Sequence, residues 1–305
     1  MGFAILNFNQ SLATEQISSR SNQSIALGVR ILSIMHLKRW ITAIVLVPLL
    51  ILLIGFGGAL WLAVVINVVC MVALWEYFSI VLNNHRGMPA VSFLLLSLVT
   101  ATAVVWSAYF HSMGALLDVL ALNVVFSGMV AVFKFKSDSS VREVVFKQVA
   151  GVIYVPLFLS YLLFIRNGRD GIIWMFLLFI VVFIGDTGAY YVGSYFGRHK
   201  LCPNVSPNKT VEGALGGLLA GLGAGALYKS FLLPGMPWGL SLLCFLSISI
   251  AGQMGDLFES LLKRVAQIKD SGKLLPGHGG VLDRIDALLF AAPVAYIFKA
   301  YLFSG

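Results

Sequence analysis

The chain has 305 residues, of which 59% are hydrophobic and only 11% are charged. Soluble domains average about 45–50% apolar and about 25% charged residues, so this composition excludes an ordinary soluble protein and predicts an all-α, polytopic integral membrane protein. The formal net charge of +8 does not indicate a nucleic-acid partner. The basic residues lie in short loops between apolar segments, where the anionic headgroups of a lipid bilayer attract them.

Residues 1–34 are polar and rich in serine, and they contain no apolar run long enough to cross a bilayer. Met35 is followed by His-Leu-Lys-Arg, so basic residues stand directly before the first long apolar segment. We interpret residues 1–34 as an N-terminal extension that is disordered or not translated, with a targeting peptide as the alternative. Residues 35–305 are interpreted as a single transmembrane domain.

A membrane-spanning helix needs about 20 predominantly apolar residues. By that measure we expect about nine transmembrane helices, near residues 40–57, 59–76, 89–110, 113–133, 148–165, 172–194, 212–231, 237–258 and 286–303. If the N-terminus is cytoplasmic, every lysine and arginine lies on the cytoplasmic side except Arg166, Arg169, Lys229 and Lys299. This bias predicts a cytoplasmic N-terminus and a C-terminus on the outside.

Asp186 falls inside the span predicted at 172–194, toward its cytoplasmic end. An acid within a span costs roughly 2.5–3.5 kcal/mol on insertion scales, which favours a role in nucleotide or cation binding over a packing hydrogen bond. In the next span, glycine recurs at every fourth position, as Gly213, Gly217, Gly221 and Gly225. Small residues at this spacing let membrane helices pack closely, and they are compatible with a homodimer.

The loop before that glycine-rich span reads Ser206-Pro-Asn-Lys-Thr-Val-Glu-Gly. Lys209 offers a positive charge to a phosphate, and the Thr210 hydroxyl can cap the helix that follows. The alternative is an ordinary capped helix start that binds no ligand.

The most polar stretch of the chain, residues 256–286, lies between two apolar segments. Its acids are Asp256, Glu259, Asp270, Asp283 and Asp286, and its bases are Lys263, Arg264, Lys269, Lys273 and Arg284. The first two acids share one helical face with Ser260 and Lys263, and the last two begin another helix. Between them, a Pro-Gly-His-Gly-Gly turn allows backbone N–H groups to form an anion-binding nest. Such a stretch can hold a divalent metal against a phosphate, with a solvated cytoplasmic loop as the alternative.

Three motifs resemble a single family. Residues 260–286 read Ser-x-Leu-Lys-Arg, four residues, Lys-Asp-x-Gly, then Leu-Pro-x-His-Gly-Gly-Val-x-Asp-Arg-Ile-Asp. This pattern resembles, without departure, the signature of the phosphatidate cytidylyltransferases (CDP-diacylglycerol synthases). Gly-Asp-Thr-x-Ala-Tyr at 185–190 and Ser-Pro-x-Lys-Thr-x-Glu-Gly at 206–213 resemble the same family. Asn208 stands where relatives often carry lysine, which removes one phosphate contact.

The resemblance implies a nucleotidyltransferase that transfers CMP from CTP to phosphatidate and releases CDP-diacylglycerol and pyrophosphate for phospholipid biosynthesis. It implies the inner (cytoplasmic) membrane of a bacterium as its location. The lipid phosphate would attack the CTP α-phosphorus in line, and because its second pKa is about 6 it needs no general base at neutral pH. The expected cofactor is Mg²⁺, with two cation sites of which the second takes the same or a different cation.

Roles follow from the same resemblance. The expected metal ligands are Asp256 and Asp283, with Asp286 and Glu259 in support. The residues expected to act on the phosphates are Lys263, Arg264, Lys269, Arg284 and His278. The residues expected to contact substrate are Asp186, Ser206, Lys209, Thr210, Ser260, Gly279 and Gly280.

Two other interpretations stay open. One is a related enzyme that uses CTP on another lipid, such as an isoprenoid phosphate or alcohol. The other is a transporter with Asp186 and Asp256 as intramembrane ion sites. A transporter is expected to show an internal repeat with paired broken helices, and no such duplication is visible in the sequence.

Overall fold

The computed structural model describes residues 47–82, 88–134, 141–268, 271–272 and 279–303. The predictions made for residues 1–34, for Lys269 and for His278 lie outside this part of the chain. So does the start of the first predicted span, of which residues 47–55 are helical. Residues 51–275 and 279–305 form one compact unit, and the description below concerns that unit.

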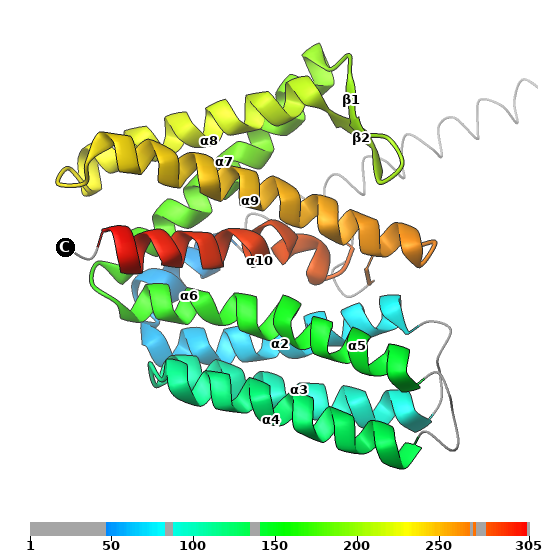
Figure 1. Ribbon diagram of the computed structural model, residues 1–305. Helices are drawn as coiled ribbons and strands as arrows, with labels where there is room; N and C mark the ends of the chain where they lie inside the picture. The colour runs from blue at the N-terminus through cyan, green and yellow to red at the C-terminus, as the bar shows by residue number, and fades with distance from the viewer. Residues whose placement is uncertain (1–46, 83–87, 135–140, 269–270, 273–278, 304–305) are drawn as a thin grey trace, which may run out of the picture. The chain divides into compact units, whose positions relative to one another are not determined.

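The unit is built from helices and one small hairpin (Figure 1). The elements are α2 (Gly58–Val81), α3 (Met88–Tyr109), α4 (Met113–Lys134), α5 (Val141–Val152), the π-helix η1 (Ile153–Leu157), α6 (Phe158–Asn167), α7 (Gly171–Phe196), β1 (Lys200–Cys202), β2 (Ser206–Thr210), α8 (Val211–Leu232), α9 (Trp238–Val265), α10 (Leu282–Ile297) and the π-helix η2 (Phe298–Leu302).

Eight segments of the described chain are long and apolar enough to cross a membrane, judged by length and composition. Two of them combine several elements: α5, η1 and α6 make the span Val141–Asn167, and α10 with η2 makes Leu282–Leu302. Each of the eight corresponds to one predicted span, from 59–76 to 286–303. The prediction of an all-α, polytopic membrane protein is therefore confirmed, while the orientation of the termini stays a prediction.

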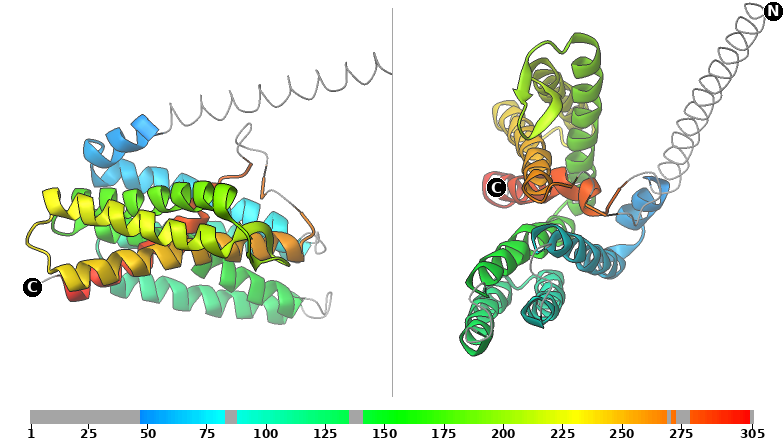
Figure 2. Two further views of the ribbon diagram at one scale, coloured as in Figure 1. Left: turned by 90° about the horizontal axis from the view of Figure 1, so that it is seen from above. Right: turned by 90° about the vertical axis from the view of Figure 1, so that its right-hand side faces the viewer.

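Two groups of helices meet at α10. On one side α7 packs most extensively on α8, and α9 on α10; on the other, α3 packs on α4 and α2. Helix α10 also contacts α6 and, less extensively, α2, so it lies between the groups (Figures 1 and 2). All the motifs singled out in the sequence lie on α7, α8, α9, α10 and the segments that join them.

The close approach of α7 and α8 depends on the glycine ridge of α8, whose four members are all buried. A Cβ atom at Gly217 would lie 2.9 Å from the Ala189 Cβ and 2.9 Å from the Gly185 carbonyl oxygen on α7. A Cβ at Gly221 would lie 3.1 Å from the Val181 carbonyl oxygen. The predicted packing role of the ridge is confirmed within this chain. Because the ridge is already covered, it is not free for a second copy, and a homodimer stays a prediction without support from it.

The hairpin between α7 and α8 is held by local contacts. Strands β1 and β2 pair antiparallel, with Lys200 opposite Thr210. Thr210 has extended backbone angles, and its hydroxyl accepts a hydrogen bond from the Gly213 N–H at 3.1 Å, so the predicted cap of α8 is confirmed. The carboxylate of Glu212 accepts from the backbone N–H groups of Arg198 and His199 and lies 2.6 Å from the His199 Nδ1. The hairpin is thereby tied to the start of α8.

Candidate active site

Three carboxylates from three helices come together beside the hairpin. The acidic cluster consists of Asp186 on α7, Asp256 on α9 and Asp286 on α10; Asp286 interacts electrostatically with the other two. Lys209, from β2, places its Nζ 2.6 Å from Asp256 Oδ2 and also interacts with Asp186. The side chains of Lys209 and Asp256 are 27% and 37% exposed, so a ligand can reach them. The structure therefore brings together residues of all three motifs.

A second set of charges is closed off from solvent. Lys263 forms ion pairs with Glu259, one turn earlier on α9, and with Asp283 on α10, where Nζ lies 2.7 Å from Oδ1. The side chains of Lys263, Glu259 and Asp283 are 15%, 0% and 11% exposed. Lys263 is the ion-pair partner of Glu259, whose two oxygens find no further hydrogen-bond donor within the described chain. These three residues join α9 to α10 in the interior.

Asp283 also contacts two described residues that precede α10. Its Oδ2 accepts hydrogen bonds from the Gly280 N–H at 2.7 Å and from the Ser271 N–H at 3.1 Å. Since Lys263 already contacts Oδ1, both oxygens of Asp283 are engaged by the chain itself. Within the described residues, Asp286 has fewer hydrogen-bond partners than Asp283: its carboxylate accepts a hydrogen bond from the N–H of the adjacent residue, Ala287.

Glu76 of α2 is a further member of the site, and it was absent from the predicted residues. Its carboxylate accepts hydrogen bonds from the Ser271 hydroxyl at 3.2 Å, the Val281 N–H at 3.0 Å and the Leu282 N–H at 2.8 Å. Glu76 is only 4% exposed. A signal was available, because Glu76 is the only charged residue between positions 51 and 81, and an ionisable residue inside a span is expected to be functional.

The remaining predicted residues surround these groups. Arg264 is exposed and donates from Nε to the Val205 carbonyl oxygen at 3.0 Å, which ties the end of α9 to the hairpin. Arg284 is exposed on the first turn of α10, and Ser260 is half-buried on α9. Ser206 begins β2, where it pairs with Cys202. Gly279 adopts a φ of +78°, a left-handed conformation that favours glycine.

The acidic cluster carries the kind of donor atoms that a divalent cation requires. Carboxylate oxygens are the ligands that Mg²⁺ prefers, and the three carboxylates of the acidic cluster have the Lys209 ammonium beside them. Within the described residues, no three His, Cys, Asp or Glu side chains are arranged as a finished ligand set. Of the four predicted ligands, Asp256 and Asp286 belong to the acidic cluster, whereas Glu259 and Asp283 are occupied by Lys263. The donor chemistry of Asp256 and Asp286 fits the cation, and their role as ligands stays a prediction.

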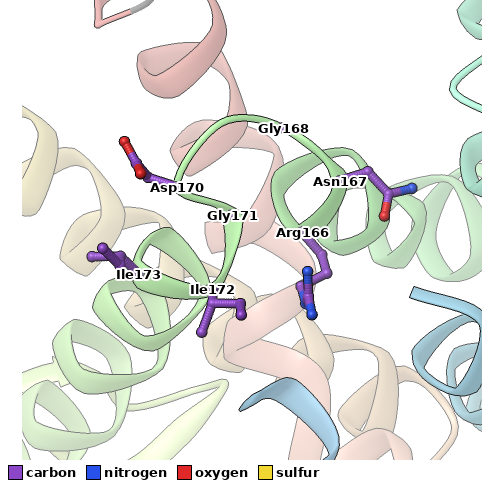
Figure 3. Close-up of a pocket in the computed structure, with 7 residues that line it drawn as sticks. All are labelled: Arg166, Asn167, Gly168, Asp170, Gly171, Ile172 and Ile173. Carbon is purple, nitrogen blue, oxygen red and sulfur yellow. The ribbon is translucent and has the colours of Figure 1, made fainter. Parts of the chain in front are cut away.

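A pocket of about 600 Å³ lies elsewhere, at the turn between α6 and α7 (Figure 3). Its lining includes Arg166, Asn167 and Asp170. The pocket lies at the N-terminal end of α7, whereas Asp186 lies in the C-terminal half of this 26-residue helix. It is therefore separate from the acidic cluster.

The chain belongs to the cytidylyltransferase family, whose model matches residues 37–302. Among its relatives, the phosphatidate cytidylyltransferase of Bacillus subtilis (strain 168) is 35% identical over 269 residues, which cover 88% of this chain and 99% of the relative. The phosphatidate cytidylyltransferase of Staphylococcus aureus (strain COL) is 32% identical over 261 residues, or 84% and 95% of the two chains. That of Mycobacterium leprae is 45% identical over 143 residues, or 47% and 46%. The family predicted from the three motifs is confirmed.

Proposed function

We propose that this protein is a phosphatidate cytidylyltransferase, which transfers CMP from CTP to phosphatidate and gives CDP-diacylglycerol and pyrophosphate. Two relatives of that name align with it along nearly their whole length. The observation that carries the proposal is the acidic cluster with Lys209 beside it, since it unites the three motifs in one accessible site. The acids lie in the C-terminal halves of α7 and α9 and near the start of α10, beside Lys209 of the hairpin. This arrangement supports phosphoryl chemistry over a transport pathway through the middle of the membrane.

The reaction requires that the negative charges of the two substrates be neutralised, and it does not require a general base. The phosphate of phosphatidate is largely deprotonated at neutral pH and can attack the CTP α-phosphorus directly. Two anions must meet for this attack, so positive groups have to neutralise them and the charge that builds up on the α-phosphorus. Lys209 lies at the acidic cluster, and the exposed guanidinium groups of Arg264 and Arg284 lie on the adjoining helix ends. These three residues are assigned to phosphate binding.

Bound Mg²⁺ would supply further charge neutralisation and orientation of the triphosphate. Asp256 and Asp286 would hold it, with Asp186 beside them to accept a second cation or orient the nucleotide. Glu259 and Asp283 have a different task here: both pair with Lys263, and Asp283 also accepts hydrogen bonds from Ser271 and Gly280, which precede α10. This divides the predicted metal ligands into two that face substrate and two that support them.

We further propose that the site lies at the cytoplasmic face of the inner membrane of a bacterium. The relatives are bacterial, and the distribution of lysine and arginine puts the loops at 197–211 and 260–286 on the inside. CTP would then reach the acidic cluster from the cytoplasm, while phosphatidate reaches it from the bilayer.

The test is a transfer assay with purified protein in detergent, phosphatidate, Mg²⁺ and radiolabelled CTP, which scores label that enters the organic phase. We expect a labelled lipid with phosphatidate, none with an isoprenoid phosphate, and none when EDTA removes the metal. Asp286→Asn should lower the rate by about 100-fold or more. Asp118→Asn, an exposed acid on α4, is the matched control and should match the wild type. Absence of label in any lipid from folded protein would contradict the proposal.

A further inference from the structure

Glu76 connects helix α2 to residues that lie about 200 positions later in the chain. The hydroxyl of Ser271 lies 195 positions later in the sequence, and the Leu282 N–H lies 206 positions later. These two residues stand on either side of residues 273–278, within the signature stretch. One buried carboxylate of α2 therefore holds the start and the end of the segment from Ser271 to Leu282.

All three groups that contact the Glu76 carboxylate are hydrogen-bond donors. Val281 donates to Oε1, and Leu282 and Ser271 donate to Oε2. An ionised carboxylate accepts on both oxygens, and hydrogen bonds to a charged acceptor are about twice as strong as neutral ones. Val281 is the N-cap of α10 and makes no side-chain cap of its own. Glu76 therefore satisfies free N–H groups of that helix, at the end where the helix dipole favours negative charge.

Two glycines of the signature stretch are explained by the same carboxylate. A Cβ atom at Gly272 would lie 2.8 Å from the Glu76 Cδ, and a Cβ at Gly280 would lie 2.7 Å from it. Any larger residue at either position would collide with Glu76. Because each glycine lies next to a residue that hydrogen-bonds to Glu76, the backbone of the segment approaches the carboxylate closely at both ends.

Asp283 also contacts the residues on both sides of positions 273–278. Ser271 donates its N–H to Asp283 and its hydroxyl to Glu76, and Gly280 donates its N–H to Asp283. Asp283 is in turn paired with Lys263. The two carboxylates thus place the first turn of α10, which carries Arg284, and Asp286 of the acidic cluster begins the second turn.

We propose that Glu76 is a positioning residue of the enzyme, which fixes Ser271 and the first residues of α10 so that Arg284 is presented to the phosphates of CTP and Asp286 to the cation. Glu76 does not itself touch substrate; it acts through Ser271 and the N-terminus of α10. This inference rests on the proposed cytidylyltransferase function and adds a residue from α2, outside the three family motifs.

The first measurement compares the steady-state kinetics of Glu76→Gln with those of the wild type. The amide has the size of the carboxylate but turns one acceptor into a donor, so at least one of the three hydrogen bonds is lost. We expect kcat/KM for CTP to fall by about 10- to 100-fold, with a raised KM for CTP and an unchanged KM for phosphatidate. Glu143→Gln is the matched control, since Glu143 is an exposed glutamate of α5 that pairs with Lys147. An unchanged KM for CTP, with kcat lowered only in proportion to the fraction of folded enzyme, would overturn the proposal.

The second measurement does not depend on activity. Hydrogen exchange of the Val281 and Leu282 amides should be about 10-fold faster in Glu76→Gln, because these amides lose their acceptor. Ser271→Ala removes only the hydroxyl contact, so it should keep these amides protected, raise the KM for CTP by a smaller factor, and remain informative if Glu76→Gln does not fold. An unchanged exchange rate of these two amides in Glu76→Gln would contradict the proposal that Glu76 holds the start of α10. If the wild type transfers no cytidylyl group, the enzymatic part falls with the proposed function, while the exchange data still decide whether Glu76 holds the segment.

Discussion

Lys263 is the residue on which two buried carboxylates depend. Its ammonium group pairs with Glu259, whose side chain is fully buried, and with Asp283, whose side chain is 11% exposed. Removing one member of a buried ion pair costs more than the pair itself contributes, because an unpaired charge stays in a medium of low dielectric constant. The sequence suggested phosphate binding for Lys263, whereas its contacts in the structure are with protein carboxylates.

Lys263→Met should therefore destabilise the fold by about 3–5 kcal/mol, which thermal unfolding in detergent would show as a clear drop in Tm. Lys147→Met is the matched control, because Lys147 also pairs with a glutamate four residues away, but the side chains of that pair are 27% and 59% exposed. Its loss should cost no more than about 0.5 kcal/mol. Equal effects of the two variants would contradict the interior role of Lys263.

At the scale of elements, the pairing of α7 and α8 is set by glycine. The ridge of α8 leaves no room for side chains where it faces Val181, Gly185 and Ala189. That contact places Asp186 on α7 near the hairpin that carries Lys209. The spacing of the glycines predicted close packing, but the partner helix became clear only from the fold.

Gly217→Leu should separate α7 from α8 and destabilise the protein by about 1–3 kcal/mol. Gly223 lies on the same helix, and a Cβ atom added there would meet no atom within 4 Å. Gly223→Leu should consequently be neutral or stabilising by up to about 1 kcal/mol, since leucine has the better helix propensity. Thermal unfolding of both variants decides the matter, and a loss of stability in Gly223→Leu would show that the ridge is not what sets the packing.

At the scale of the whole molecule, the prediction still to be tested is the orientation of the protein in the membrane, that is, which loops face the cytoplasm. The hairpin with Cys202 is expected on the cytoplasmic side, and the turn with Arg169 on the other. Cys202 is half-buried, while Cys70 and Cys244 are buried, so Cys202 is a natural reporter. Arg169, whose side chain is 92% exposed, offers a second position.

A maleimide that does not cross membranes should label Cys202 in inside-out vesicles and leave it unlabelled in right-side-out vesicles. Arg169→Cys in a Cys202→Ser background should show the reverse pattern. The opposite result for both positions would invert the topology and would remove the argument that CTP enters the site from the cytoplasm.

Much of the site could be predicted because its motifs are local. Asp186, Lys209, Asp256 and Asp286 were each found from residue type and spacing, and the structure brings them together. Which of the acids are accessible to a ligand and which are held by other protein groups could not be predicted from the sequence. Asp256 and Asp283 look alike in sequence, but one is accessible and the other is enclosed by Lys263 and the backbone.

The sequence by itself determined the membrane class, eight of the spans in the described chain, the cap at Thr210 and the family. Each of these depends on composition or on residues a few positions apart, where hydropathy and helix geometry act directly. Only the tertiary structure decided that Glu76 meets Ser271 and the start of α10, and that Lys209 pairs with Asp256. Such contacts depend on which faces of uniformly apolar helices pack together, and in a span that is apolar all round the periodicity does not specify that face.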